Sequence, residues 1–198
     1  MTTKRSPKKM RVPPAGQAIQ FKVTLRDIRP PIWRRVVVPD NFTLGQLHEV
    51  IQRSMGWYNS HLHAFRFGEV SYSSPAFELE DMEAENEATV FLSQMVSRAK
   101  QKFIYEYDFG DGWEHEVVVE KLLPFDPQTK YPVCLDGARA CPPEDCGGVP
   151  GYYGILEALQ APKKTAWQKE LIEWLEEGFD PERFDLKAVN RELGSLGV

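Results

Sequence analysis

Long apolar runs are missing from this sequence, and no stretch approaches the roughly 20 apolar residues that a membrane-spanning helix needs. Residues 1–16 are basic but lack the apolar h-region of a secretory signal. The first absence argues against a membrane-spanning protein, and the second argues against a secreted one. We therefore expect a cytoplasmic protein without a membrane partner.

Cysteine is also scarce, since 198 residues contain 3 cysteines. Three cysteines are few for a chain of this size, and an odd number cannot pair completely in disulfides. We therefore expect thiols or metal ligands. Glycine occurs without a P-loop or dinucleotide-binding pattern, and serine occurs without the local signature of a catalytic triad. The sequence contains no complete catalytic set.

Apolar and aromatic residues are plentiful, at 42% and 12% of the chain, which is enough for a sizeable core. The length predicts one α+β domain over residues 17–198, preceded by a disordered basic leader over residues 1–16. The net charge is −5 and the leader contributes +5, so the rest of the chain carries −10. Because an acidic body repels phosphate, we expect contact with nucleic acid only through the leader.

Hydrophobic periodicity predicts the elements of the first two thirds of the chain. Thr43 and Gln46 form a capping-box pattern and Gly56 is a typical residue at a helix end, so residues 44–55 are predicted as a helix. A shorter helix is predicted over residues 89–100. The predicted strands cover residues 19–25, 32–38, 61–67, 103–109 and 114–122, and Gly110-Asp111-Gly112 joins the last two as a hairpin.

The last third changes in composition at Pro124. Residues 124–151 are rich in Pro, Gly and Cys and are predicted as a long loop, whereas residues 152–198 are predicted as a helical cap on the sheet. The helices expected there cover residues 154–160, from Thr165 to Gly178, and from Asp180 to Leu193. The predicted fold is α+β, with a β-grasp-like mixed sheet of order ββα-β-ββ packed on a helix.

Three segments resemble one known family, the plasmid pRiA4b ORF-3-like proteins, also labelled as resolvase-like insertion-element passengers. They are Ile32–Arg35, Tyr105–His115 and Pro142–Gly148. The resemblance implies a compact α+β fold and an association with bacteria, archaea and mobile elements, and it implies no established activity. A serine recombinase would need a nucleophilic serine among arginines and a DNA-binding surface, which an acidic body does not supply.

The first candidate site is a zinc site made by Cys134, Cys141 and Cys146, with His115 as a fourth ligand. Three thiolates and one imidazole suit tetrahedral zinc, which would hold the long loop in place. Only the C-x4-C interval has the spacing usual for structural zinc. The alternative is that the three cysteines are small, half-buried thiols.

The second candidate site is a metal site made by His61, His63 and Asp108. Alternate residues of a strand point to the same face, so both imidazoles could join a carboxylate from a neighbouring strand. A metal held there would activate water for hydrolysis. The alternative is that the two histidines continue the apolar surface of Phe65 and Phe67.

The third candidate is a functional surface where the hairpin turn lies beside the Pro142–Gly148 loop. Its residues are Tyr107, Asp108, Asp111, Trp113, His115, Glu144 and Asp145. Because these motifs are rigid and polar, the first functional hypothesis is a non-enzymatic binding or interaction module. The second is a metal-dependent hydrolase using the His/Asp cluster.

A third hypothesis is association with nucleic acid through the basic leader together with Arg34 and Arg35, which follow Trp33. Arginines beside an exposed aromatic ring can bind phosphate and stack on bases. The alternative is that both arginines pair with acidic residues on an adjacent strand.

Overall fold

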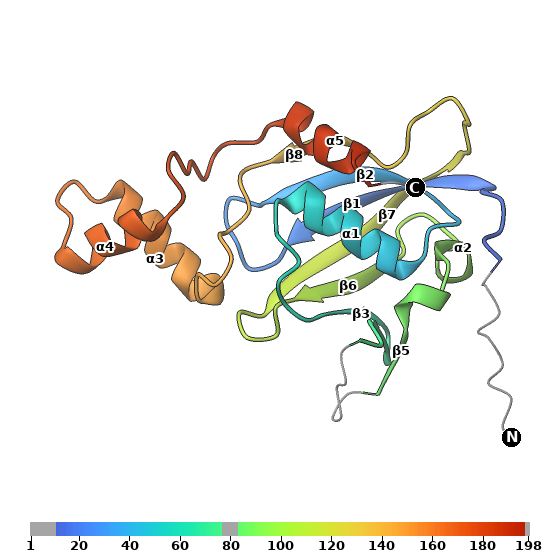
Figure 1. Cartoon of the computed structure of the whole chain (residues 1–198), viewed down its shortest axis with the longest axis horizontal. Coiled ribbons are helices and arrows are strands. Elements are labelled where there is room, and N and C mark those ends of the chain that lie inside the picture. Colours follow the sequence, from blue (N-terminus) through green and yellow to red (C-terminus); the bar gives the residue numbers. More distant parts are fainter. Residues whose placement is uncertain (1–10, 77–82, 197–198) are drawn as a thin grey trace, which may run out of the picture.

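The computed structural model describes residues 11–76 and 83–196, and an eight-stranded sheet forms its centre (Figure 1). The sheet order is β5-β4-β3-β6-β7-β1-β2-β8, and every neighbouring pair is antiparallel except β4 and β5. The predicted α+β fold is confirmed, with more strands than the β-grasp-like order contained. The strands are β1 (Gln17–Leu25), β2 (Trp33–Pro39), β3 (His63–Phe67), β4 (Val70–Ser73), β5 (Ala84–Asn86), β6 (Lys102–Tyr107), β7 (Trp113–Pro124) and β8 (Val133–Ala138).

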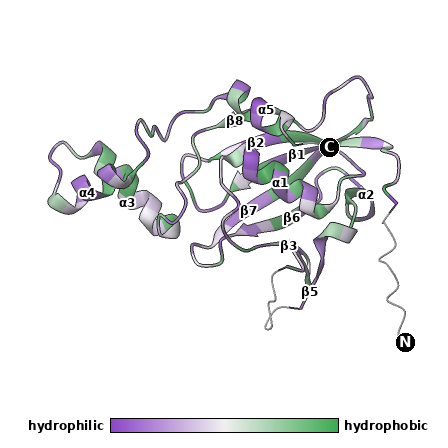
Figure 2. Cartoon of the chain, in the orientation of Figure 1, coloured by the Kyte–Doolittle hydropathy of each residue, from purple (hydrophilic) through white to green (hydrophobic). Residues whose placement is uncertain are grey.

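Helix α1 (Leu44–Met55) begins and ends where its capping residues predict. The Thr43 side chain accepts a hydrogen bond from the Gln46 amide, the Gln46 side chain accepts one from the Thr43 amide, and Gly56 is left-handed. The helix carries hydrophobic and hydrophilic residues (Figure 2), and its buried side includes Leu47 and Ile51. Burial of this apolar stripe joins α1 to the core.

Alternation along β6 and β7 divides the sheet into two faces. Tyr105 and Tyr107 are fully buried and lie opposite His115 and Trp113 in the antiparallel register. The other face carries ion pairs between strands, which keep it compatible with water. These pairs are Arg26–Glu114, Arg66–Glu106, Arg66–Glu114, Arg35–Glu120 and Lys102–Glu116.

The helix predicted over residues 89–100 is wrong in extent. The structure has two single turns there, η1 (Glu87–Thr89) and α2 (Leu92–Met95). The amide of Leu44 donates to the Val90 carbonyl, and the amide of Leu92 donates to the Phe42 carbonyl. These bonds to the start of α1 replace the helical bonds that a longer helix would make.

The predicted loop over residues 124–151 contains an edge strand, β8, which pairs with β2. Leu135 is 46% exposed, so β8 lacks the regular alternation that predicts a half-buried strand. The register also shifts between Arg35 and Val36. Pairing with β2 forms this strand despite the Pro- and Gly-rich surroundings.

The predicted helical cap covers the sheet only in part. Helices α3 (Gly148–Gln160) and α4 (Ala166–Trp174) extend away from the sheet, whereas α5 (Leu186–Gly194) lies against β8 and α1 (Figure 1). Helix α4 has no buried residue. Asp185 caps α5, so this helix starts later than the predicted Asp180.

Residues 1–10 of the predicted leader and residues 77–82 of the acidic segment lie outside the described residues. At the end of the leader, the amides of Gly16 and Gln17 donate to the Asp40 carboxylate. Among the described residues, no helix combines the length and apolar character needed to cross a membrane.

Candidate functional site

The turn between β6 and β7 lies beside the Pro142–Gly148 loop, as the sequence predicts. Asp111 Oδ2 accepts a hydrogen bond from the Gly147 amide at 3.1 Å. A Cβ atom on Gly148 would lie 2.5 Å from the Asp111 carbonyl oxygen, and Gly148 has φ +67°. Glycine at position 148 therefore permits the close approach of the two segments.

Asp108 is held in place by its own turn. It adopts φ +56°, and its Oδ1 atom accepts hydrogen bonds from the amides of Gly110 and Asp111 at 3.0 and 3.3 Å. This local bonding explains why an aspartate tolerates the left-handed conformation. The Asp108 side chain is 10% exposed, and its Oδ2 atom lies 3.7 Å from Nε2 of His61.

The segment that follows α1 supplies the third part of the site. Glu144 Oε1 accepts hydrogen bonds from the Tyr58 amide and the Tyr107 hydroxyl, both at 2.9 Å. The Tyr107 hydroxyl in turn accepts one from the Ser60 amide at 2.9 Å. Burial raises the pKa of Tyr107, so this hydroxyl remains protonated and donates to Glu144.

His61 lies at the centre of the carboxylates. Its Nε2 atom lies 3.1 Å from Asp145 Oδ1 and 3.6 Å from Glu144 Oε2. This nitrogen is shielded from solvent and forms no hydrogen bond to the described residues. Ligand atoms of His61, Asp108 and Asp145 lie within 4.8 Å of one another, and we call these three residues the His61 cluster.

The other histidine of the predicted metal pair lies elsewhere. His63 Nε2 contacts both carboxylate oxygens of Glu87 at 2.9 and 3.0 Å, and its ring stacks on His48 with 3.4 Å between centroids. The strand starts at His63, so the alternation expected from His61 to Phe67 does not include His61. The structure therefore joins His61 and Asp108 to Asp145 and leaves His63 in the core.

The predicted Cys134, Cys141, Cys146 and His115 zinc set is not brought together. Within residues 11–76 and 83–196, one group of three or more possible metal-ligand side chains has its ligand atoms close together, and that group is the His61 cluster. His115 is fully buried and its Nδ1 atom donates to the Tyr105 carbonyl at 3.2 Å. Burial raises the pKa of Cys146 to about 12 and holds the pKa of Cys141 well above its ordinary value, which disfavours thiolates.

The predicted functional surface divides into a core part and a part at the junction of the turn and the loop. Trp113 and His115 are core residues, with 1% and 0% exposure. Tyr107 is also buried, although its hydroxyl reaches Glu144. Asp108, Asp111, Glu144 and Asp145 line the junction of the turn and the loop.

The arginines predicted to contact nucleic acid have partners within the protein. Arg34 is 2% exposed, and its guanidinium donates to the carbonyls of Ser54, Trp33, Ala138 and Arg139. Arg35 forms two hydrogen bonds with Glu120 and lies over the Trp33 ring. Neither guanidinium is available as a free phosphate-binding group.

The sequence interpretation missed Tyr58 and Ser60, whose amides fix Glu144 and Tyr107. They follow Gly56, the left-handed residue that ends α1. The signal available in the sequence was the helix end at Gly56 followed closely by the candidate ligand His61. A segment of this kind lies at the surface and can position side chains.

The fold and the His61 cluster define an α+β protein with a polar site between a hairpin turn and a proline-rich loop. The family model described as plasmid pRiA4b ORF-3-like protein matches residues 17–188, and the chain belongs to this family. The resemblance seen in the sequence is thereby confirmed.

Two similar proteins extend over almost the whole chain. The uncharacterized protein y4hQ of Sinorhizobium fredii is 37% identical over 184 residues, which cover 92% of this chain and 94% of that protein. The crystal structure of MM3350 from Methanosarcina mazei Go1, a protein of unknown function, has a TM-score of 0.78 and 34% identity. This similarity covers 88% of our chain and 98% of MM3350.

Proposed function

We propose that the protein is a binding module that holds a divalent metal ion through His61, Asp108 and Asp145. The observation that carries this proposal is the convergence of one imidazole nitrogen and two carboxylates within 4.8 Å. The Nε2 atom of His61 faces these carboxylates without a hydrogen bond, and in the tautomer protonated at Nδ1 it offers a lone pair to a cation.

Electrostatics favours a cation at this position. Glu144 adds a third carboxylate, with Oε2 at 3.6 Å from His61 Nε2. Carboxylates held close together repel one another, and a divalent ion offsets that repulsion. A donor set of one nitrogen and several oxygens suits Zn²⁺ or Mn²⁺, so zinc remains part of the proposal at this site.

The test is isothermal titration of chelator-treated protein with Zn²⁺ and with Mn²⁺. We expect one ion per chain, and we expect Asp108→Asn or Asp145→Asn to weaken binding by at least about tenfold, since even outer partners of ligands contribute that much. The matched control is Asp27→Asn, because Asp27 is exposed and shares the left-handed φ of Asp108 and Asp145. Equal affinity in all four proteins would contradict the proposal.

A metal-dependent hydrolase is the second candidate function. A cavity of about 430 Å³, lined by His61, Asp108 and Phe109 among others, lies next to the cluster and offers room for a substrate. Three protein ligands leave coordination positions for water, which a metal ion activates. Metal-dependent turnover of phosphate or carboxylate esters that Asp108→Asn abolishes would favour the enzyme, whereas stoichiometric binding without turnover favours the binding module.

The family description names a plasmid, which supports an association with plasmids, and we extend this part of the proposal to mobile elements. Its test is the location of the genes that encode close relatives. Genes found mainly on chromosomes, away from plasmids and insertion elements, would contradict this part.

A further inference from the structure

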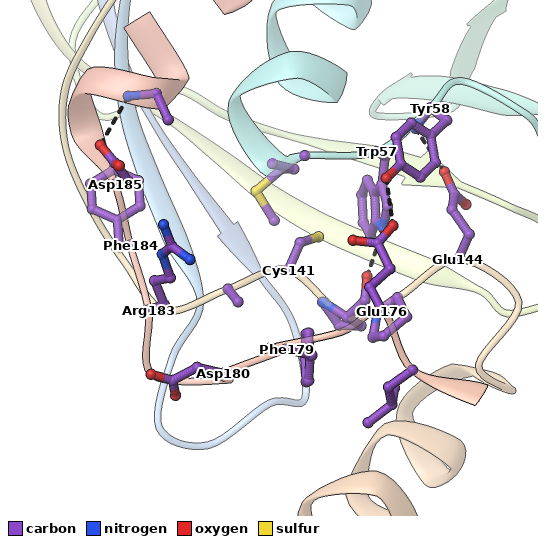
Figure 3. A pocket seen from close by; sticks show the side chains of 18 of the residues that line it. Trp57, Tyr58, Cys141, Glu144, Glu176, Phe179, Asp180, Arg183, Phe184 and Asp185 are labelled. Carbon is purple, nitrogen blue, oxygen red and sulfur yellow. Dashed lines mark hydrogen bonds between the residues drawn. The ribbon is translucent and has the colours of Figure 1, made fainter. Parts of the chain in front are cut away.

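A larger cavity of about 710 Å³ lies where the C-terminal segment passes the end of α1 and the loop before Glu144 (Figure 3). Residues 174–180 and 183–185 border it on one side, and residues 55–58 and 140–145 on the other. Its volume is in the range of about 300–1,000 Å³ that small-molecule sites occupy. Asp145 of the His61 cluster and the neighbouring Glu144 line this cavity, whereas His61 and Asp108 do not.

Apolar and aromatic groups form much of the cavity wall. Met55, Cys141 and Phe179 line it together with the rings of Trp57 and Tyr58. The Trp57 ring nitrogen donates to the Pro142 carbonyl at 3.0 Å, which fixes the indole in place. An aliphatic chain would find apolar contacts here, and a cation would find aromatic rings.

The charge of the lining is strongly negative. Its carboxylates are Glu144, Asp145, Glu176, Glu177, Asp180 and Asp185. Among the described lining residues, Arg34 and Arg183 carry the positive charges. Arg34 already donates to four carbonyl groups, and Arg183 lies on the same side as Asp180 and Asp185 (Figure 3).

The acidic end of the cavity is organised around Tyr58. The Tyr58 hydroxyl donates to Glu176 Oε1 at 2.7 Å, and the Tyr58 amide donates to Glu144 Oε1 at 2.9 Å. Figure 3 shows Trp57, Tyr58, Glu144 and Glu176 together at this end. Two carboxylates are therefore held beside two aromatic rings, which is the combination that recognises an organic ammonium group.

We propose that this cavity binds an alkylammonium ligand, with its charged group at Glu144, Glu176 and Tyr58. The aliphatic part of the ligand lies along Met55, Cys141 and Phe179. This site is next to the His61 cluster and shares Glu144 with its surroundings, but it includes neither His61 nor Asp108. A free diamine and the side chain of a lysine residue share the required chemistry.

Calorimetric titration of the full chain with 1,5-diaminopentane tests the proposal, with 1,5-pentanediol as the neutral ligand of similar length. We expect saturable binding of the diamine and none of the diol. Glu176→Gln should weaken diamine binding about fivefold, the effect of losing one partly exposed charge interaction. The matched control is Glu173→Gln, which makes the same charge change at an exposed residue of α4 outside the cavity.

Several results would overturn the proposal. The first is that neither the diamine nor a lysine derivative shows saturable binding. The second is that the diol binds as tightly as the diamine. The third is that Glu176→Gln and Glu173→Gln have equal effects on diamine binding. Loss of diamine binding in Asp108→Asn with full binding in Glu176→Gln would also overturn it, because the ligand would then occupy the His61 cluster. Failure of metal binding alone leaves this proposal standing.

The source of the ligand is tested by a second titration with Nα-acetyl-lysine methylamide. Tighter binding of the diamine supports a free amine as the ligand, and tighter binding of the lysine derivative supports a lysine side chain. Both outcomes support the alkylammonium site if Glu176→Gln weakens binding and Glu173→Gln does not.

Discussion

Arg34 and Arg35 are neighbours in the sequence with opposite roles in the structure. Arg34 is 2% exposed and its donors reach carbonyls on α1, on β2 and around the end of β8. Arg35 lies on the outer face of the sheet, where Glu120 pairs with it. The buried guanidinium thus joins three elements, whereas the outer one forms a partly exposed ion pair.

This difference predicts different effects on stability. Arg34→Met should lower the free energy of unfolding by at least about 3 kcal/mol, because it leaves buried carbonyls without donors. Arg35→Met is the matched control and should lower it by less than about 1 kcal/mol. Urea denaturation followed by tryptophan fluorescence measures both, and equal losses would contradict the structural role of Arg34.

Gly148 and Gly112 share a left-handed backbone conformation but differ in how closely other atoms approach them. Substitutions at the two positions therefore distinguish the effect of backbone strain from the effect of close packing. Their φ angles are +67° and +68°, but a Cβ atom would clash with Asp111 only at Gly148 and would meet nothing within 4 Å at Gly112. Gly112→Ala should therefore cost about 1 kcal/mol, the cost of a left-handed alanine. Gly148→Ala should cost clearly more and should also weaken metal binding, since it displaces the loop that carries Asp145.

Denaturation and metal titration of the two variants check this prediction. Comparable stability and comparable metal affinity would show that the turn and the loop do not need their close contact.

At the scale of elements, α1 and α4 share the same capping box but differ in burial. Thr43 and Thr165 each accept a hydrogen bond from a glutamine amide three residues later. Helix α1 is packed into the core, whereas α4 has no buried residue. Of these two helices, we therefore expect α1 to unfold with the core and α4 to open locally.

Thr43→Ala should lower the global free energy of unfolding by about 1 kcal/mol, the usual value of an N-cap. Thr165→Ala should leave the global transition nearly unchanged and increase amide hydrogen exchange within α4, because local opening does not require the core to unfold. Hydrogen exchange measured by NMR, together with urea denaturation, distinguishes the two effects. A global loss of the same size from Thr165→Ala would contradict the separation of α4 from the core.

At the scale of the whole molecule, buried histidines predict how stability depends on pH. Burial lowers the pKa of His48 to about 3 and that of His115 to about 4, from an ordinary value of 6.5. The unfolded chain binds protons at these residues below pH 6.5, and the folded protein does so only nearer pH 4 and 3. Their contribution to stability is therefore complete above pH 6.5 and is lost as the pH falls.

We expect the free energy of unfolding to fall between pH 6 and pH 5 with a slope that approaches about 1.4 kcal/mol per pH unit for each of the two histidines. Urea denaturation across this range measures the slope. His48→Gln should reduce the slope by about 1.4 kcal/mol per pH unit, which corresponds to one proton. A flat profile in the unchanged protein would show that these histidines titrate alike in both states.

The sequence alone determined the elements whose local signals are strong. The capping box and Gly56 delimit α1, and alternation with a glycine-rich turn predicts the β6–β7 hairpin. Short-range rules suffice there because each signal lies within a few residues of the structure that it produces. The family resemblance likewise depended on short motifs.

Tertiary structure decided the features that depend on distant partners. Strand β8 forms by pairing with β2, and the predicted helix before β6 is replaced by bonds to the start of α1. His61 and His63 seemed equivalent as an alternating pair, yet one meets Asp145 and the other meets Glu87. The spacing of residues along a chain does not specify which distant carboxylate reaches a given imidazole, because packing of the whole sheet and its loops determines that contact.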